Sequence, residues 1–233
     1  MKKYDKVVVC GMYRSGTTLQ WNLLKHISRM HSIRDRLGGP MQVAKVHLDW
    51  TNLKIPKKWA FTKEGMTSKN FVIYSRRDIR DVIVSFCLLR KANLNDFRHN
   101  YRNYMGFLKW IVENDNLISK EALSNKNIKI FSYEKNILGD DNLYELYKTF
   151  AGYFGVFDFF SEDFLVKFKF DNVKKYTSSL KEHELKTEYW PNHLNDGKVG
   201  KYKSHINNDE LQEILSEPIL KDWLVKHKYL EES

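Results

Sequence analysis

A short apolar run, residues 7–9, leads directly into the segment Cys-Gly-Met-Tyr-Arg-Ser-Gly-Thr-Thr, residues 10–18. An amphipathic stretch, residues 18–27, comes next, so the pattern predicts a strand, a glycine-containing loop and a helix. In such a connection the backbone N–H groups of the loop and the positive end of the helix dipole point at one place. The segment therefore predicts a phosphate-binding loop.

The position of the cation distinguishes this loop from the loop that binds ATP or GTP. That loop ends Gly-Lys-Ser/Thr, and its lysine reaches the β- and γ-phosphates. Here Thr17 stands where the lysine would be, and the cation is Arg14, inside the loop. We therefore expect a phosphate whose neighbouring group is not a nucleotide γ-phosphate. Taken alone, the segment also fits an ordinary strand–turn–helix connection.

Predicted strands and helices alternate along the chain. Strands are expected at 6–10, 42–48, 71–75 and 128–131, and helices over 16–30, from about 80 onward, over 97–112 and over 142–154. The alternation favours an α/β fold of three layers and P-loop type, with a central, mostly parallel sheet and helices on both faces. A ligand is then expected at the carboxyl ends of the strands. The length fits a single domain over residues 1–233.

Composition narrows the class of protein. Hydrophobic residues make up 42% of the chain, which is typical of a globular protein. The formal net charge is +10, but the lysines are dispersed among acids and no run of five like charges exists. A basic surface that attracts a polyanionic small molecule explains this pattern, and we expect no nucleic-acid partner.

No apolar segment approaches the roughly 18 residues of a membrane span. The two cysteines, Cys10 and Cys87, lie in apolar settings and are expected to be buried free thiols, which suits a reducing compartment. We therefore expect a cytoplasmic protein.

Two other segments offer groups at strand ends. Arg77 lies in a turn after the strand at 71–75, and Ser85 follows eight residues later on a predicted helix. The two side chains converge on one phosphate if that helix packs beside the first loop; a solvated charged turn is the alternative. Lys45 and His47 end the strand at 42–48, where the histidine suits a general base and the lysine a charge stabiliser. A histidine at the edge of the core is the alternative there.

A late segment combines glycine with cations. Gly197, Lys198 and Gly200 lie in a lysine-rich stretch that suits a loop closing over an anion. An ordinary surface turn is the alternative.

Together and in this order, these segments resemble the motifs of sulfotransferases that use 3′-phosphoadenosine 5′-phosphosulfate (PAPS). Residues 11–18 resemble the family's 5′-phosphosulfate loop, Pro-Lys/Arg-Ser-Gly-Thr-Thr, and residues 77–85 its 3′-phosphate motif, Arg-x-x-Arg/Lys-Asp-x-x-x-Ser. The Lys45–His47 segment is similar to the family's Lys-Thr-His, and residues 131–134 are similar to its Phe-x-Tyr-Glu. Residues 197–202 look like its late Lys-Gly-x-x-Gly-x-Trp loop.

The resemblance implies transfer of a sulfuryl group from PAPS to a hydroxyl or amine, with 3′-phosphoadenosine 5′-phosphate (PAP) as product and no metal required. His47 takes the role of catalytic base, assisted by Arg14 and Lys45. The residues implied to bind the donor are Arg14, Ser15, Gly16, Thr17, Thr18, Arg77, Ser85, Tyr133, Gly197 and Lys198.

The chain departs from the family pattern at three places. Leu19 replaces a Trp that stacks near the adenine, and Tyr13 replaces the Pro before the cation. In the late loop Asp196 stands where a Lys is common, Lys198 follows the first Gly, and Tyr202 replaces the Trp. We therefore expect the late contact with the 3′-phosphate to come from Lys198 or its backbone. The acceptor stays open among small phenols, lipids and carbohydrates, as does the oligomeric state.

Two other functions were weighed. A P-loop nucleotide kinase or NTPase predicts Gly-Lys-Ser/Thr and a strand-end aspartate for Mg²⁺, for which only Asp49 is available. A basic nucleic-acid-binding module predicts lysines and arginines clustered with aromatic residues on one face. Neither pattern fits as well as the sulfotransferase motifs.

Overall fold

The computed structural model describes residues 6–29, 42–51, 60–98, 101–136 and 198–231, and the isolated positions 163, 166, 167, 171, 172 and 175. Four parallel strands form the main sheet of this part of the chain, in the order β2–β1–β5–β6. They are β1 (Lys6–Gly11), β2 (Gln42–Lys45), β5 (Asn70–Arg76) and β6 (Ile128–Ser132). The two central strands, β1 and β5, are buried along nearly their whole length, as expected for a parallel sheet covered on both faces.

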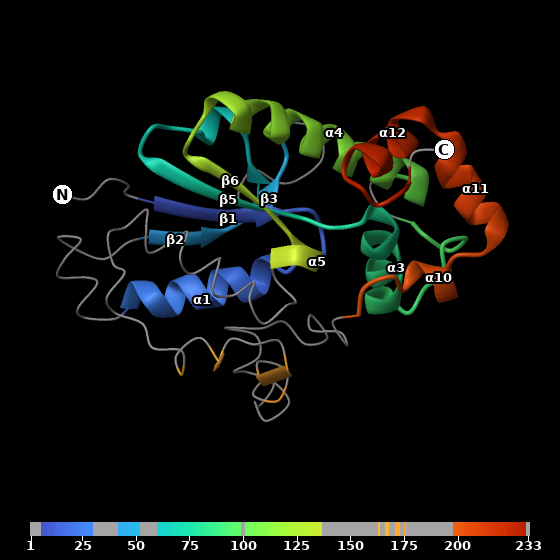
Figure 1. The fold of residues 1–233 in the computed structure, drawn as a ribbon, viewed down its shortest axis with the longest axis horizontal. Coiled ribbons are helices and arrows are strands. Elements are labelled where there is room, and N and C mark those ends of the chain that lie inside the picture. The colour runs from blue at the N-terminus through green and yellow to red at the C-terminus, as the bar shows by residue number, and fades with distance from the viewer. Residues whose placement is uncertain are drawn as a thin grey trace.

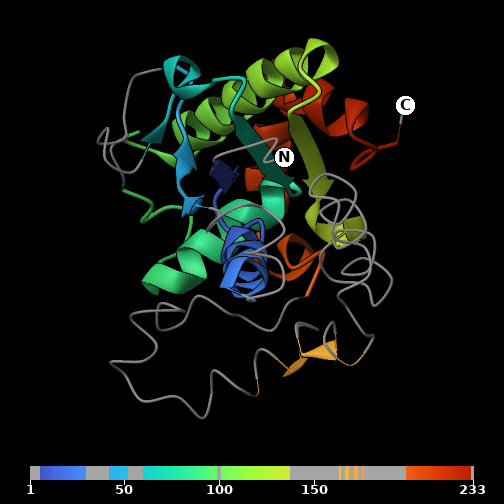
Figure 2. The same ribbon diagram turned by 90° about the vertical axis from the view of Figure 1, so that its left-hand side faces the viewer.

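Helices cover both faces of this sheet. Helix α1 (Thr17–Arg29) lies below the sheet and α4 (Tyr104–Ser124) lies above it in Figure 1. The turned view in Figure 2 shows the same two helices on opposite sides of the strands. The predicted α/β fold of three layers, with a parallel sheet at its centre, is confirmed.

The strand order fixes where loops converge. From β1 the chain moves to β2 on one side, and later returns to β5 on the other side of β1. The order therefore reverses between β1 and β5, and in an open parallel sheet a crevice forms outside the carboxyl ends of such a pair. Helix α3 (Ile79–Arg90), which follows β5, lies beyond those ends in Figure 1.

The strand predicted over 42–48 is divided in the structure. Strand β2 ends at Lys45, and β3 (His47–Leu48) pairs instead with β4 (Ala60–Phe61) in a separate two-stranded sheet. The N–H of Val46 still bonds to the carbonyl of Val9 on β1 at 3.0 Å, and the chain then leaves β1 to pair in the second sheet. His47 is thereby carried past the edge of the main sheet.

The helix predicted over 97–112 is wrong at its start. Helix α4 begins at Tyr104, where the side chain of Asn103 caps it by accepting the N–H of Gly106 at 2.8 Å, and it continues to Ser124. Arg102 just before it has a φ of 69°, which no helix allows. Phe97 and Tyr101 are buried in the preceding turn, so their apolar spacing comes from packing on the core. The helix predicted over 142–154 lies outside the described residues.

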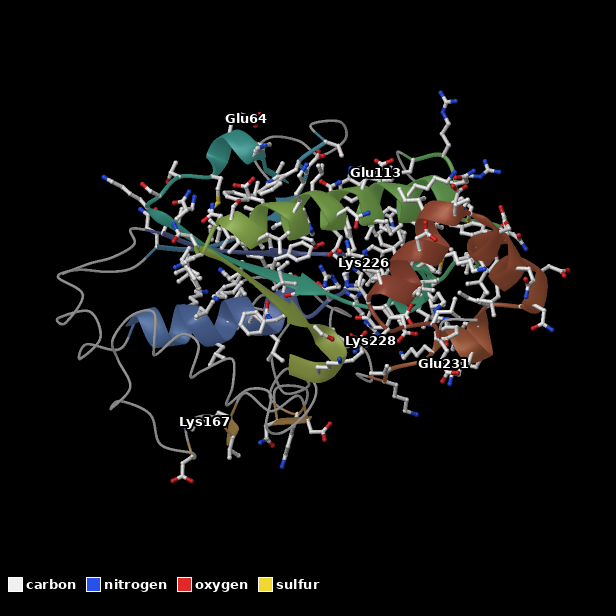
Figure 3. The ribbon with its side chains drawn as sticks, turned by 45° about the horizontal axis from the view of Figure 1, so that its top comes forward. Glu64, Glu113, Lys167, Lys226, Lys228 and Glu231 are labelled. Atoms are coloured by element: carbon white, nitrogen blue, oxygen red, sulfur yellow. The ribbon has the colours of Figure 1, made fainter. Side chains whose placement is uncertain are left out.

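The remaining described elements lie around the sheet and α3. They are η2 (Lys63–Gly65), α5 (Tyr133–Asn136), α10 (Tyr202–His205), α11 (Asn208–Ser216) and α12 (Pro218–Lys226). In Figure 3 the exposed side chains of Glu64 on η2 and Glu113 on α4 lie on the side of the sheet away from α1. Within the described ranges, every helix is too short or too polar to cross a lipid bilayer.

Candidate functional site

The loop after β1 is held tightly against β5. A Cβ atom on Gly11 would lie 2.6 Å from the carbonyl oxygen of Ser75, so only glycine fits this strand end. The hydroxyl of Ser15 donates to the carbonyl of Met12 at 2.6 Å, closing the loop on itself. Gly16 follows with a φ of 81°, a left-handed conformation that glycine adopts without steric cost. The loop then enters α1 at Thr17.

Arg14 occupies a strained position in this loop. Its φ is 60°, and the left-handed region costs a non-glycine residue about 1–2 kcal/mol. Its Nε donates to the hydroxyl of Ser85 on α3 at 3.0 Å. Helix α3 therefore packs beside the first loop, as the convergence of the two segments requires. Burial, and then the positive charge of Arg77, lower the pKa of Arg14 to about 10, which still leaves it charged at neutral pH.

Arg77 connects three segments around the crevice. Its Nη1 donates to the carbonyl of Arg14 at 2.9 Å and its Nη2 to the carbonyl of Lys198 at 3.2 Å. The guanidinium also lies 4.3 Å from the ring centre of Tyr133, the first residue of α5, a typical cation–π contact. Its Nε is buried and has no hydrogen-bond partner among the described residues. A buried cation with a spare donor suits an anionic ligand.

The sequence analysis missed Asp81, which anchors the late segment on α3. Its carboxylate accepts the N–H of Gly200 at 2.7 Å and the N–H of Tyr202 at 3.1 Å. Arg77 Nη2 lies 3.6 Å from the same carboxylate. The sequence held no signal for this role, because the partners of Asp81 are two backbone N–H groups of a distant segment.

Lys45 reaches the same place from β2. Its Nζ donates to the hydroxyl of Thr18, in the first turn of α1, at 2.7 Å. Burial, and then the charge of Arg14, lower the pKa of Lys45 to about 8. The end of β2 therefore adds a second cation to the first loop.

His47 lies two residues beyond the end of β2, next to the same loop. Its imidazole stacks on the ring of Tyr13, with the centres 4.5 Å apart and the planes 11° from parallel. Burial, and then the charge of Lys45, lower the pKa of His47 to about 4. The ring is therefore neutral at physiological pH, which a general base requires.

An aromatic cluster surrounds the other sides of Tyr13. The rings of Phe86, Phe107 and Trp110 lie within 6.1 Å of Tyr13, centre to centre. Phe97 and Tyr101 extend the cluster through Phe107. The aromatic cluster consists of Tyr13, Phe86, Phe97, Tyr101, Phe107 and Trp110. It brings together the first loop, α3, α4 and the turn before α4.

The structure thus brings together the cations, hydroxyls and imidazole singled out in the sequence. Gly197 lies outside the described residues, while Lys198 contributes its backbone carbonyl to Arg77. Leu19 is buried, and the indole of Trp21 donates to the carbonyl of Val43 on β2 at 3.3 Å.

Other chemistry has less support in this part of the chain. Cys10 and Cys87 are buried free thiols, and burial raises the pKa of Cys87 to about 11, so neither is a ready nucleophile. The described residues contain no group of three His, Cys, Asp or Glu side chains placed to hold a metal ion.

The fold is α/β, and it gathers the cations Arg14, Lys45 and Arg77 at the carboxyl ends of strands on both sides of the switch in strand order. The same fold occurs in mouse sulfotransferase SULT7A1 complexed with PAP, with a TM-score of 0.60 and 15% identity over 94% of this chain and 84% of that one. It occurs also in retinol dehydratase complexed with androsterone and inactive cofactor PAP, with a TM-score of 0.55 and 17% identity over 96% and 81% of the two chains. A second retinol dehydratase complex, with retinol and PAP, gives a TM-score of 0.58 and 16% identity over 96% and 82%.

The chain therefore has the sulfotransferase fold. No protein-family profile matches its sequence, and no curated protein of related sequence is found.

Proposed function

We propose that this protein is a sulfotransferase that moves the sulfuryl group of PAPS to a hydroxyl or amine of a small molecule or glycan. One observation carries the proposal: Arg14, Ser85 and Arg77 are joined by hydrogen bonds at the switch in strand order, with His47 beside the same loop. The shared fold supports it, since the three comparison structures contain PAP.

The residues present fit this donor. PAPS supplies an activated sulfuryl group and two separate phosphate positions. The first loop offers the backbone N–H groups at the start of α1 together with Arg14 and Lys45, which suit the 5′-phosphosulfate. Arg77 and Ser85, with the late segment fixed on Asp81, suit the 3′-phosphate. Tyr133, whose ring packs against the guanidinium of Arg77, would lie near the adenine.

His47 would act as the base. Its neutral imidazole takes the proton of the acceptor hydroxyl while that oxygen forms its bond to sulfur and the sulfur–oxygen bond to the 5′-phosphate breaks. The electron pair of the broken bond stays on the phosphate oxygen, where the charges of Arg14 and Lys45 stabilise it. Both cations are held in place before the reaction by Ser85 and Thr18, so little reorganisation is needed.

The aromatic cluster indicates which class of acceptor the site favours. Because it adjoins His47 through Tyr13, it favours a flat or apolar alcohol, such as a phenol or lipid, over a glycan. Androsterone and retinol in the retinol dehydratase complexes are molecules of that kind.

Calorimetric titration tests the donor. We expect PAP to bind the wild type, with ATP and an oligonucleotide binding far more weakly. Arg77→Ala should weaken PAP much more than adenosine 5′-phosphosulfate, which lacks the 3′-phosphate; equal losses would show that Arg77 does not bind that group.

A second variant tests the base. His47→Ala should leave PAP affinity nearly unchanged and remove most turnover in an acceptor screen with PAPS. Joint loss of binding and turnover would count against the role of His47 as a base.

A further inference from the structure

Tyr13 lies in the first loop, the one after β1, and contacts His47. It directly precedes Arg14, whose backbone is in the left-handed region and whose side chain points to Ser85. The Tyr13 ring instead lies flat against His47, at 4.5 Å and 11°. Of these two successive residues, Arg14 therefore lies with the groups proposed to bind the donor, and Tyr13 lies against the proposed base.

The stack on Tyr13 orients the imidazole. Within the part of the chain that the structure describes, the imidazole of His47 makes no hydrogen bond, and its ring partner is Tyr13. An aromatic stack adds about 0.5–1.5 kcal/mol beyond burial and favours one relative orientation. The plane of the imidazole therefore depends on the plane of the Tyr13 ring.

The Tyr13 ring is itself fixed. Phe86 meets it edge-on at 5.9 Å and 80°, Phe107 lies at 5.4 Å and Trp110 at 6.1 Å. These partners come from α3 and α4, which pack on each other. Since three rings on two helices surround Tyr13, its ring cannot turn without moving the core.

The charges near this stack are few. Lys45 acts on His47 from β2, and Asp49 and Arg90 act on Tyr13 from the segment after β3 and from α3. Tyr101, from the turn before α4, also lies within electrostatic range of Tyr13. Burial and Asp49 raise the pKa of Tyr13 to about 12, so its hydroxyl stays neutral and the ring acts through packing.

We propose that Tyr13 is a positioning residue, whose ring holds the imidazole of His47 in a fixed plane and covers one face from water. This inference rests on the proposed function for its meaning in catalysis. The sulfotransferase motif has Pro at this position, and a proline has no aromatic ring with which to form this stack. The stack ties the base to the loop that carries Arg14, and any shift of that loop moves both.

The experiment uses nuclear magnetic resonance to observe the histidine rings of the full chain, in which histidine is isotopically labelled in the ring. His47→Gln identifies the His47 signal among those of the eight histidines. We expect His47 to stay neutral down to about pH 5 in the wild type and in Tyr13→Phe, with a ring-current shift on its carbon-bound protons. In Tyr13→Ala the ring-current shift should vanish and the pKa of His47 should rise by about one unit or more toward 6.5.

Two further variants keep the test sharp. Tyr13→Leu fills the space without stacking, so the ring-current shift should be lost in a protein that still folds. Phe97→Leu changes the aromatic cluster at a ring that does not touch His47, and its His47 signals should match the wild type. Melting temperature and PAP titration on each sample identify loss of fold or of donor binding.

The proposal is overturned if His47 keeps its shifts and its titration in Tyr13→Ala and Tyr13→Leu, or if Phe97→Leu changes them equally. Absence of PAP binding in the wild type would instead refute the proposed sulfotransferase function, while the signals would still report on the stack.

Discussion

Asp81 allows a quantitative prediction about the late segment. Its two carboxylate oxygens accept the N–H groups of Gly200 and Tyr202 at 2.7 and 3.1 Å. In Asp81→Asn only the amide oxygen can accept, so one N–H faces an NH₂ group. A hydrogen bond to a charged group contributes about 1.5–3 kcal/mol, and we expect a loss of that size in the attachment of residues 200–202.

The loss should appear in ligand affinity. If PAP binds only when the segment is attached, 1.5–3 kcal/mol corresponds to a fall of about 10- to 150-fold. The carboxylate also neutralises Arg77 at 3.6 Å, so its removal frees positive charge that offsets part of the loss. We therefore expect a fall near the lower end, about tenfold, for PAP. Adenosine 5′-phosphosulfate, which lacks the 3′-phosphate, should lose less.

Two measurements check this reasoning. Calorimetry gives both affinities, and hydrogen exchange gives the protection of the Gly200 and Tyr202 amides. Asp209→Asn, in the first turn of α11, is an exposed matched control that should change neither. If exchange at residues 200–202 accelerates while PAP affinity stays at the wild-type value, the late segment takes no part in binding and the reasoning fails.

Two other predictions follow from burial in the site. Turnover should be level between about pH 5 and pH 7. It should fall to half near pH 4, as His47, whose pKa burial lowers to about 4, becomes protonated, and near pH 8, as Lys45, whose pKa burial lowers to about 8, loses its charge. Because the pKa of His47 is lower in the folded chain than the ordinary 6.5, its contribution to stability is lost as pH falls from about 6.5 to 4. A pH–rate profile with one limb near 6.5 would contradict the burial of the imidazole. Gly11→Ala places a methyl group 2.6 Å from the Ser75 carbonyl and should cost about 1–3 kcal/mol, lowering the melting temperature by several degrees in calorimetry. An unchanged melting temperature would show that β1 and β5 separate to admit it.

Much of the sheet could be predicted from the sequence. The apolar runs of β1 and β5 are short, rich in β-branched or aromatic residues and bounded by polar turns, and these features together indicated strands. Since parallel strands end at one edge, placing Arg14, Lys45 and Arg77 after three strands was enough to predict their convergence.

Other features could not be predicted from local patterns. The start of α4 was missed because Phe97 and Tyr101 have helical spacing yet pack from a turn, and burial alone does not distinguish the two. The stack of Tyr13 on His47 joins the loop after β1 to a strand outside the main sheet, a contact that depends on where β2 stops pairing. The role of Asp81 could not be predicted, because its partners, two backbone N–H groups, carry no signal in the sequence.

The electrostatics of the crevice explain why these groups belong together. Burial, and then the charge of Arg77, lower the pKa of Arg14, and burial, and then the charge of Arg14, lower the pKa of Lys45. Neighbouring cations of the group therefore destabilise one another. Each is partly or wholly buried, where like charges are screened least. Within the described ranges Asp81 is the acid paired with this group, and half of its hydrogen-bonding capacity is used on the late segment. A folded chain retains such an excess of buried positive charge at a cost in stability, which a bound anion would offset. The cations come from the ends of three strands, β1, β2 and β5, and this supports the proposed donor, an anion with more than one charged group.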